Sequence, residues 1–203
     1  MPGTTNKFSV FTMTRIAALT ALSAVLFLTV EIPIVAFYKL DFSNLPALLG
    51  AFAMGPLPAL IILVLKTGIH LLIKGLGSTM GIGDLADLIM SVAFVLPAAL
   101  IYSRNKNRKS ALVGMATGTL CTIVVGVLVN WLVLIPAYMA AYHMDINAIV
   151  GMATKTLPFV DTEWKLLLFV TAPFNLLKGI VISLITFLIY KPLSPILHMK
   201  TRQ

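Results

Sequence analysis

The chain has 203 residues, of which 59% are hydrophobic and only 11% are charged. This composition excludes an ordinary soluble domain and is typical of a membrane protein. The formal net charge of +8 does not indicate a partner among nucleic acids, because the basic residues are not gathered on a hydrophilic domain.

Long apolar runs follow one another along the whole chain. A helix needs roughly 20 mostly apolar residues to cross the hydrocarbon layer of a bilayer. We therefore expect an all-α integral membrane protein, folded as one domain over residues 1–203 into a compact bundle of six transmembrane helices. The predicted spans cover approximately residues 12–31, 44–54, 56–74, 84–103, 111–140 and 165–190.

The second span is the exception in length. Gly55-Pro56 interrupts the apolar stretch that holds the second and third spans, and proline both lacks an amide proton and disfavours helix in the residue before it. The segment 44–54 is too short to cross a bilayer alone. We expect it to enter the membrane tilted or to be partly buried in protein.

The orientation follows from the connection between the fourth and fifth spans, which reads Arg-Asn-Lys-Asn-Arg-Lys over residues 104–109. Positive charge in a short loop marks the cytoplasmic side. With six spans, both termini are then cytoplasmic. The predicted location is the bacterial plasma membrane, which the chain crosses several times.

The motifs of several functional classes are missing. The sequence has no Gly-x-x-x-x-Gly-Lys-Ser/Thr loop, so we do not expect it to hydrolyse ATP. His70 has no ligand-type neighbour at metal-binding spacing, and no metal is expected. A membrane enzyme acting on lipids would need a catalytic constellation; Asp84, Asp87 and His70 are its only candidates, and their spacing matches no known motif. The sequence therefore predicts no catalytic residues.

Three polar residues lie within predicted spans, where each polar group needs a partner. Asn175 and Lys178 are three residues apart, which places them on one helix face, and Asn130 lies at a similar depth in the fifth span. Together they can hydrogen-bond the edge of a heteroaromatic ring that carries several acceptors. Alternatively, they pair across helices, or Lys178 extends to the membrane interface.

A second polar series follows the third span. Lys66, His70 and Lys74 recur every fourth residue and so share one helix face. They are expected to meet Asp84 or Asp87 at the start of the fourth span. Both an ion-pair network that joins the two helices and contact with a ligand are open interpretations.

These residues resemble a known family. The run Lys-Leu-Asp-Phe-Ser-Asn-Leu-Pro at 39–46, the Gly55-Pro56 break followed by Lys66, and the Asn175-x-x-Lys178 pair with Asn130 upstream are similar to the riboflavin-binding S components of energy-coupling-factor (ECF) vitamin transporters. The likeness extends from about Arg15 to Tyr190. One departure is Gly-Asp-Leu-Ala-Asp at 83–87, where the family pattern would read Gly-Glu-x-x-Asn.

The resemblance implies a six-helix bundle that captures riboflavin from outside and has no energising machinery of its own. Asn130, Asn175 and Lys178 would address the polar edge of the isoalloxazine ring. Riboflavin, or its phosphate FMN, would be the transported ligand rather than a cofactor. The further ligand-binding positions that we assign are Asp41, Phe42, Asn44 and Lys66.

The resemblance also assigns a gate and a partner. The loop from Glu31 to Asn44, with Lys39 and Leu40, would cover the site. An alanine face on the first span would meet the transmembrane coupling subunit, which works with two ATPase subunits. The residues of that face are Ala17, Ala21 and Ala24.

Two alternatives remain open. The chain can be an S component for another vitamin, such as thiamine, biotin or a folate. It can also be a self-sufficient secondary transporter, with the Gly55-Pro56 interruption as its broken helix.

Overall fold

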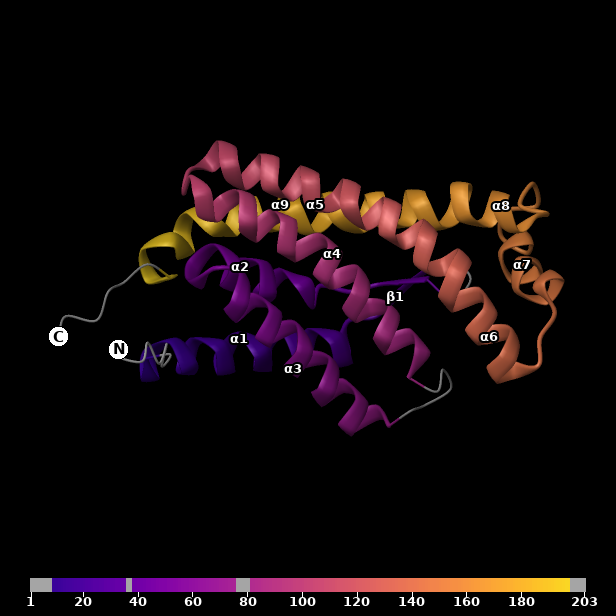
Figure 1. The fold of residues 1–203 in the computed structure, drawn as a ribbon, viewed down its shortest axis with the longest axis horizontal. Helices are drawn as coiled ribbons and strands as arrows, with labels where there is room; N and C mark the ends of the chain where they lie inside the picture. Colours follow the sequence, from indigo (N-terminus) through magenta and orange to yellow (C-terminus); the bar gives the residue numbers. More distant parts are fainter. Residues whose placement is uncertain (1–8, 36–37, 76–80, 198–203) are drawn as a thin grey trace, which may run out of the picture.

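A computed structural model describes residues 9–35, 38–75 and 81–197, with side chains as far as Tyr190. Its helices run roughly along one long axis (Figure 1). In the first half of the chain the elements are α1 (Val10–Thr29), β1 (Ile32–Val35), β2 (Tyr38–Leu40), α2 (Asn44–Met54), α3 (Pro56–Lys74) and α4 (Ile82–Arg104). In the second half they are α5 (Arg108–Val129), the π-helical turn η2 (Asn130–Leu134), α6 (Ile135–Tyr142), α7 (Ile146–Thr154), α8 (Glu163–Leu166), the π-helical turn η3 (Leu167–Thr171) and α9 (Ala172–Leu197).

The predicted membrane bundle is confirmed. In the part of the chain that the structure describes, five helical stretches are long and apolar enough to cross a membrane; they are Val10–Thr29, Pro56–Lys74, Ile82–Arg104, Arg108–Tyr142 and Glu163–Tyr190. The second predicted span, 44–54, forms α2, which has 11 residues, nine of them buried. As expected for so short a helix, protein rather than lipid surrounds most of α2.

Local sequence signals explain where helices begin. The side chains of Ser9, Asn107 and Asp145 accept hydrogen bonds from backbone N–H groups in the first turns of α1, α5 and α7, as N-cap residues do. Gly55 separates α2 from α3 with a φ of 98°, a left-handed value that glycine adopts without strain. Pro56 then begins α3, where its missing N–H costs nothing.

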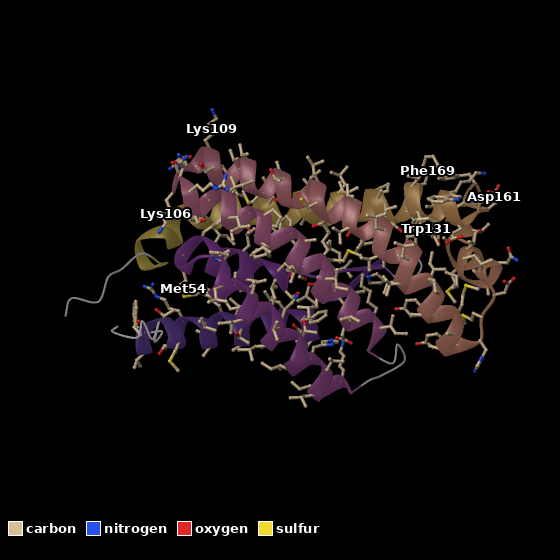
Figure 2. The ribbon with its side chains drawn as sticks, in the orientation of Figure 1. Met54, Lys106, Lys109, Trp131, Asp161 and Phe169 are labelled. Atoms are coloured by element: carbon tan, nitrogen blue, oxygen red, sulfur yellow. The ribbon has the colours of Figure 1, made fainter. Side chains whose placement is uncertain are left out.

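The basic connection between α4 and α5 lies at one end of the molecule. Lys106 and Lys109 lie at the end where α1 begins and α9 finishes, and Asp161 lies at the opposite end (Figure 2). The described chain therefore begins and finishes on the side of the basic connection. We refer to the opposite side, which holds Asp161, as the outer end.

Two elements at the outer half were not expected from the sequence. Strands β1 and β2 form an antiparallel hairpin in which Ile32 pairs with Leu40 and Pro33 with Lys39. The short helix α7 lies in the connection between the fifth and sixth spans (Figure 1). The predicted gate of residues 31–44 is thus partly a β-hairpin; its residues 36 and 37 lie outside the described part.

Close packing of α4 on α5 depends on small residues. A Cβ atom added to Gly114 would lie 2.9 Å from the carbonyl oxygen of Ala98, and one added to Gly118 would lie 2.2 Å from that of Phe94. Real Cβ atoms do not approach backbone oxygens this closely. These glycines therefore allow the backbones of the two helices to meet, as small residues do in membrane bundles.

Gly118→Ala is expected to destabilise the bundle by about 1 to 3 kcal/mol, because the added methyl group must push α4 away from α5. Apparent thermal unfolding in detergent measures the effect. Gly68→Ala in α3 is the matched control, since nothing lies within 4 Å of a Cβ atom there. Equal midpoints for the two variants would contradict the proposed close contact.

Candidate ligand-binding site

A cavity of about 430 Å³ lies between α1, the hairpin, α3, α4, the η2–α6 segment and α9. Its volume falls within the range of small-molecule pockets, roughly 300 to 1,000 Å³. Its aromatic lining residues are Phe27, Tyr38, Tyr138 and Phe174. Its charged and amide lining residues are Glu31, Lys39, Asp41, His70, Lys74, Asp84, Asp87, Asn130, Asn175 and Lys178.

The three polar residues predicted from the transmembrane spans all line this cavity. Asn130 is 2% exposed and Asn175 is 4% exposed, so both amides lie at its deep side. Lys39 and Lys74, with side chains 55% and 40% exposed, lie at its open side. The cavity thus has an amide-lined floor and a mouth that carries two lysines.

Tyr38 in β2 connects the floor to the hairpin, and no sequence pattern indicated its role. Its hydroxyl donates a hydrogen bond to Asn130 Oδ1 over 3.0 Å and shares another with the Thr171 hydroxyl. Asn130 is the first residue of η2 and Thr171 is the last of η3. Single π-helical turns of this kind often occur at functional sites. The tyrosine therefore joins the two irregular turns through one hydroxyl group.

The protonation state of Tyr38 suits this role. Burial raises the pKa of its phenol well above the ordinary value, because a phenolate loses its hydration inside the protein. The hydroxyl accordingly keeps its proton at neutral pH and remains a donor.

Each asparagine uses its amide NH₂ within its own helix. Asn130 Nδ2 donates to the Gly126 carbonyl oxygen over 2.7 Å, and Asn175 Nδ2 donates to the Thr171 carbonyl oxygen over 2.9 Å. These bonds fix the orientation of both side chains. They leave one lone pair on Asn130 Oδ1 and the whole of Asn175 Oδ1 without a partner among the described residues, and each amide keeps a second N–H.

Behind and beside the floor, two lysines and two aspartates form a four-charge cluster: Asp41, Lys66, Asp87 and Lys178. Lys178 Nζ lies 2.7 Å from Asp41 Oδ2 and 3.1 Å from Asp87 Oδ1. Lys66 Nζ lies 2.9 Å from Asp87 Oδ2. The charges of the four residues cancel. Lys178 therefore does not extend to the membrane interface, because two carboxylates hold it inside the bundle.

Lys66 is completely buried and is held by further oxygen atoms. Its Nζ donates to Ser43 Oγ over 2.6 Å and to Asn44 Oδ1 over 2.9 Å. Asp41 in turn accepts a hydrogen bond from the Ser43 backbone N–H. A buried ammonium group needs such a full set of partners to offset its lost hydration.

A second ionic group, the mouth cluster, consists of Glu31, Lys39, His70, Lys74 and Asp84. Glu31 contacts Lys39 over 2.8 Å and Lys74 over 2.6 Å, while His70 Nδ1 hydrogen-bonds Asp84. Partial burial acts to raise the pKa of the Glu31 carboxyl, but its hydrogen bonds and attraction to the two lysines outweigh burial and lower the pKa. Glu31 is therefore ionised at neutral pH.

The expected meeting of the third and fourth spans is found for two of the three residues. Lys66 pairs with Asp87, and His70 with Asp84, whereas Lys74 pairs with Glu31, just after α1. The helical spacing correctly placed the three side chains on one face. It gave no sign of Glu31, because that residue lies far away in the sequence.

Several of the assigned positions do not line the cavity. Asn44 and Lys66 lie behind its wall, where they hydrogen-bond each other, and neither Leu40 nor Phe42 is among the lining residues. Phe27, Tyr138 and Phe174 do line it, although the sequence analysis did not select them. An aromatic residue in an apolar helix gives no sign of which face it occupies.

The alanine face on α1 needs one correction. Ala17 and Ala21 are exposed, but Ala24 is only 4% exposed. Ala24 follows Thr20 by one helical turn and joins the buried side of α1 together with Ser23 and Phe27. Of these three alanines, Ala17 and Ala21 are therefore the ones that lie on the surface.

Charge balance in the four-charge cluster can be tested without a ligand. Lys178→Met leaves two carboxylates with one ammonium group and is expected to cost about 3 kcal/mol of stability. Adding Asp41→Asn restores neutrality, so the double variant should unfold at a higher temperature than Lys178→Met alone.

The matched control is Lys165→Met, which breaks the exposed pair with Asp161 and is expected to leave the unfolding temperature nearly unchanged. A double variant that unfolds at the same temperature as Lys178→Met, or at a lower one, would show that charge balance does not stabilise the cluster.

Comparison with known proteins places this geometry in context. The family model described as "ECF transporter, substrate-specific component" matches residues 11–190. The chain is 30% identical over 181 residues to "Riboflavin transporter RibU" of Staphylococcus aureus (strain TCH60), covering 88% of each chain. It is 28% identical over 159 residues to "Riboflavin transporter FmnP" of Bacillus subtilis (strain 168), covering 78% of each.

The fold is also similar to a solved structure. The match to "Structure and mechanism of the S component of a bacterial ECF transporter" has a TM-score of 0.68 at 28% sequence identity. It covers 93% of this chain and 98% of the other. The arrangement of helices is therefore shared over nearly the whole of both chains.

Proposed function

Because the chain belongs to the substrate-specific components of ECF transporters, we propose that its substrate is riboflavin, bound in the cavity at the outer end. A substrate-specific component binds and passes on its substrate and is not an enzyme. Relatives of this chain are named riboflavin transporters, and this supports the choice of vitamin.

The observation that carries the proposal is the combination of aromatic and amide groups in one cavity. The ring centroids of Tyr38 and Phe174 lie 4.9 Å apart. Both residues line the cavity together with Asn130 and Asn175. A flat heteroaromatic ring can pack against the aromatic side chains. Its carbonyl, nitrogen and N–H groups match amides, which both donate and accept.

The burial gradient suggests how the ligand lies. The amides are deeply buried, and the lysines of the mouth cluster are partly exposed. We place the isoalloxazine ring on the amide-lined floor and the ribityl chain toward the mouth. The ammonium group of Lys178 uses two of its N–H donors for Asp41 and Asp87. Its third N–H can then donate to an acceptor on the ring.

The hairpin is the proposed gate. Glu31, Lys39 and Leu40 belong to it or directly precede it, and Tyr38 attaches it to the floor. Moving the hairpin outward requires breaking the Tyr38 hydrogen bonds and the contact between Glu31 and Lys74. Bound ligand would stabilise the closed position by adding contacts to the same residues.

Family membership implies an ECF module as the partner of this chain. We propose that the exposed alanines Ala17 and Ala21 on α1 meet its transmembrane coupling subunit, because small side chains let another helix approach closely. Two ATPase subunits would supply the energy. Uptake of riboflavin by cells that express this chain without any such module would favour a secondary transporter instead.

Purified protein is expected to quench riboflavin fluorescence on binding. Asn175→Ala should weaken binding by about 1 to 3 kcal/mol, because buried hydrogen-bonding groups lose their partner. The matched control is Asn147→Ala, which removes an exposed amide that bonds Asp145 near the start of α7, and this variant should bind like the wild type.

A competition panel defines the outcome that contradicts the proposal. Thiamine, biotin and folate are not expected to displace riboflavin from the wild-type protein. Tight binding of one of these vitamins, with no measurable affinity for riboflavin, would show that the chain is an S component for a different substrate.

A further inference from the structure

The carboxylate of Glu31 lies between two lysines and close to a histidine at the cavity mouth. Its Oε2 contacts Lys39 Nζ over 2.8 Å, and its Oε1 contacts Lys74 Nζ over 2.6 Å. His70 Nε2 lies 4.0 Å from the same Oε1. The groups come from β2 and α3, so the carboxylate connects these two elements.

His70 places a further polar nitrogen at this position. The residue is 93% buried, its Nδ1 is engaged with Asp84, and its Nε2 has no hydrogen-bond partner among the described residues. Its ring stacks on Phe27 at a centroid distance of 4.0 Å, which fixes the direction of Nε2. A buried polar atom without a partner is costly, and here it borders the cavity.

The lysines around the cavity are already paired with carboxylates, which disfavours the binding of an additional anion. Among the described lining residues, Lys39 and Lys74 are paired with Glu31, and Lys178 is paired with Asp41 and Asp87. A phosphate monoester carries a charge of about −1.5 to −2 at pH 7. Such a group at the mouth would have to displace the Glu31 carboxylate from its lysines or lie beside it.

We propose that Glu31 occupies an anion subsite at the cavity mouth and thereby selects ligands with an uncharged tail over the corresponding phosphate esters. The choice of riboflavin and its 5′-phosphate as probes rests on the function proposed above. The other lining carboxylates do not fit this role. Asp84 bonds a histidine rather than a lysine, and Asp41 and Asp87 belong to the buried four-charge cluster.

The test compares the affinities of each variant for riboflavin and for riboflavin 5′-phosphate, measured by titration of the purified protein. Glu31→Gln keeps the shape of the side chain and removes its charge. We expect it to shift the ratio of the two dissociation constants by about tenfold in favour of the phosphate ester, since a like charge beside an anion is strongly unfavourable. A general loosening of the hairpin would weaken the binding of both ligands alike and would therefore leave this ratio unchanged.

Asp161→Asn is the matched control. It also removes a carboxylate that pairs with a lysine at the outer end, but Asp161 does not line the cavity. The same change in net charge should therefore leave the ratio unaltered. Lys74→Gln tests the opposite sign, because it removes a cation and leaves Glu31 charged, and it should shift the ratio further toward riboflavin.

The possible outcomes separate this inference from the proposed function. Opposite shifts in Glu31→Gln and Lys74→Gln, with none in Asp161→Asn, support the subsite. Riboflavin binding with a ratio unchanged in Glu31→Gln, or changed equally in Asp161→Asn, overturns it and leaves the proposed function standing. A wild-type protein that binds neither flavin overturns both.

Discussion

The buried cluster of Asp41, Lys66, Asp87 and Lys178 determines where the rest of the site can lie. Its four charges come from the segment after β2, from α3, from α4 and from α9. Removing any one of them would leave an unpaired charge in a low-dielectric interior, which costs several kcal/mol. The chain can therefore close its bundle only when these four segments meet, and their meeting places Lys178 at the cavity.

The same cluster relates the hairpin to the membrane helices. Asp41 begins the stretch after β2 and is anchored to Lys178, while Tyr38 at the other end of β2 is anchored to Asn130 and Thr171. A short two-stranded hairpin is marginally stable alone, so these side-chain contacts are what hold it against the bundle. The ligand cavity therefore lies between rigid helices and a weak element that side-chain contacts hold in place.

The sequence predicted the membrane class and the spans well because hydrophobic length reports directly on the bilayer. The orientation, which rests on positive charge in a short loop, stays a prediction. Helical spacing also placed Lys66 with His70 and brought Asn175 together with Lys178. It did not find Tyr38, and it did not show that Glu31, already assigned to the gate, pairs with Lys74. The partners of both residues lie on other elements, and helical spacing does not relate such positions. It also assigned Ala24 to an exposed face, since periodicity cannot show which neighbouring helix covers a given turn of α1. The roles of Asn130, Asn175 and Lys178 in ligand contact stay predictions.

The most direct test is the identity of the small molecule that the protein carries when it is purified from cells supplied with a mixture of vitamins. Mass spectrometry of the extracted ligand gives both its identity and its amount. The account predicts riboflavin at one molecule for each chain, since one cavity combines the amide floor with the aromatic lining. A different vitamin in that amount, or a protein that retains no flavin under these conditions, would contradict it.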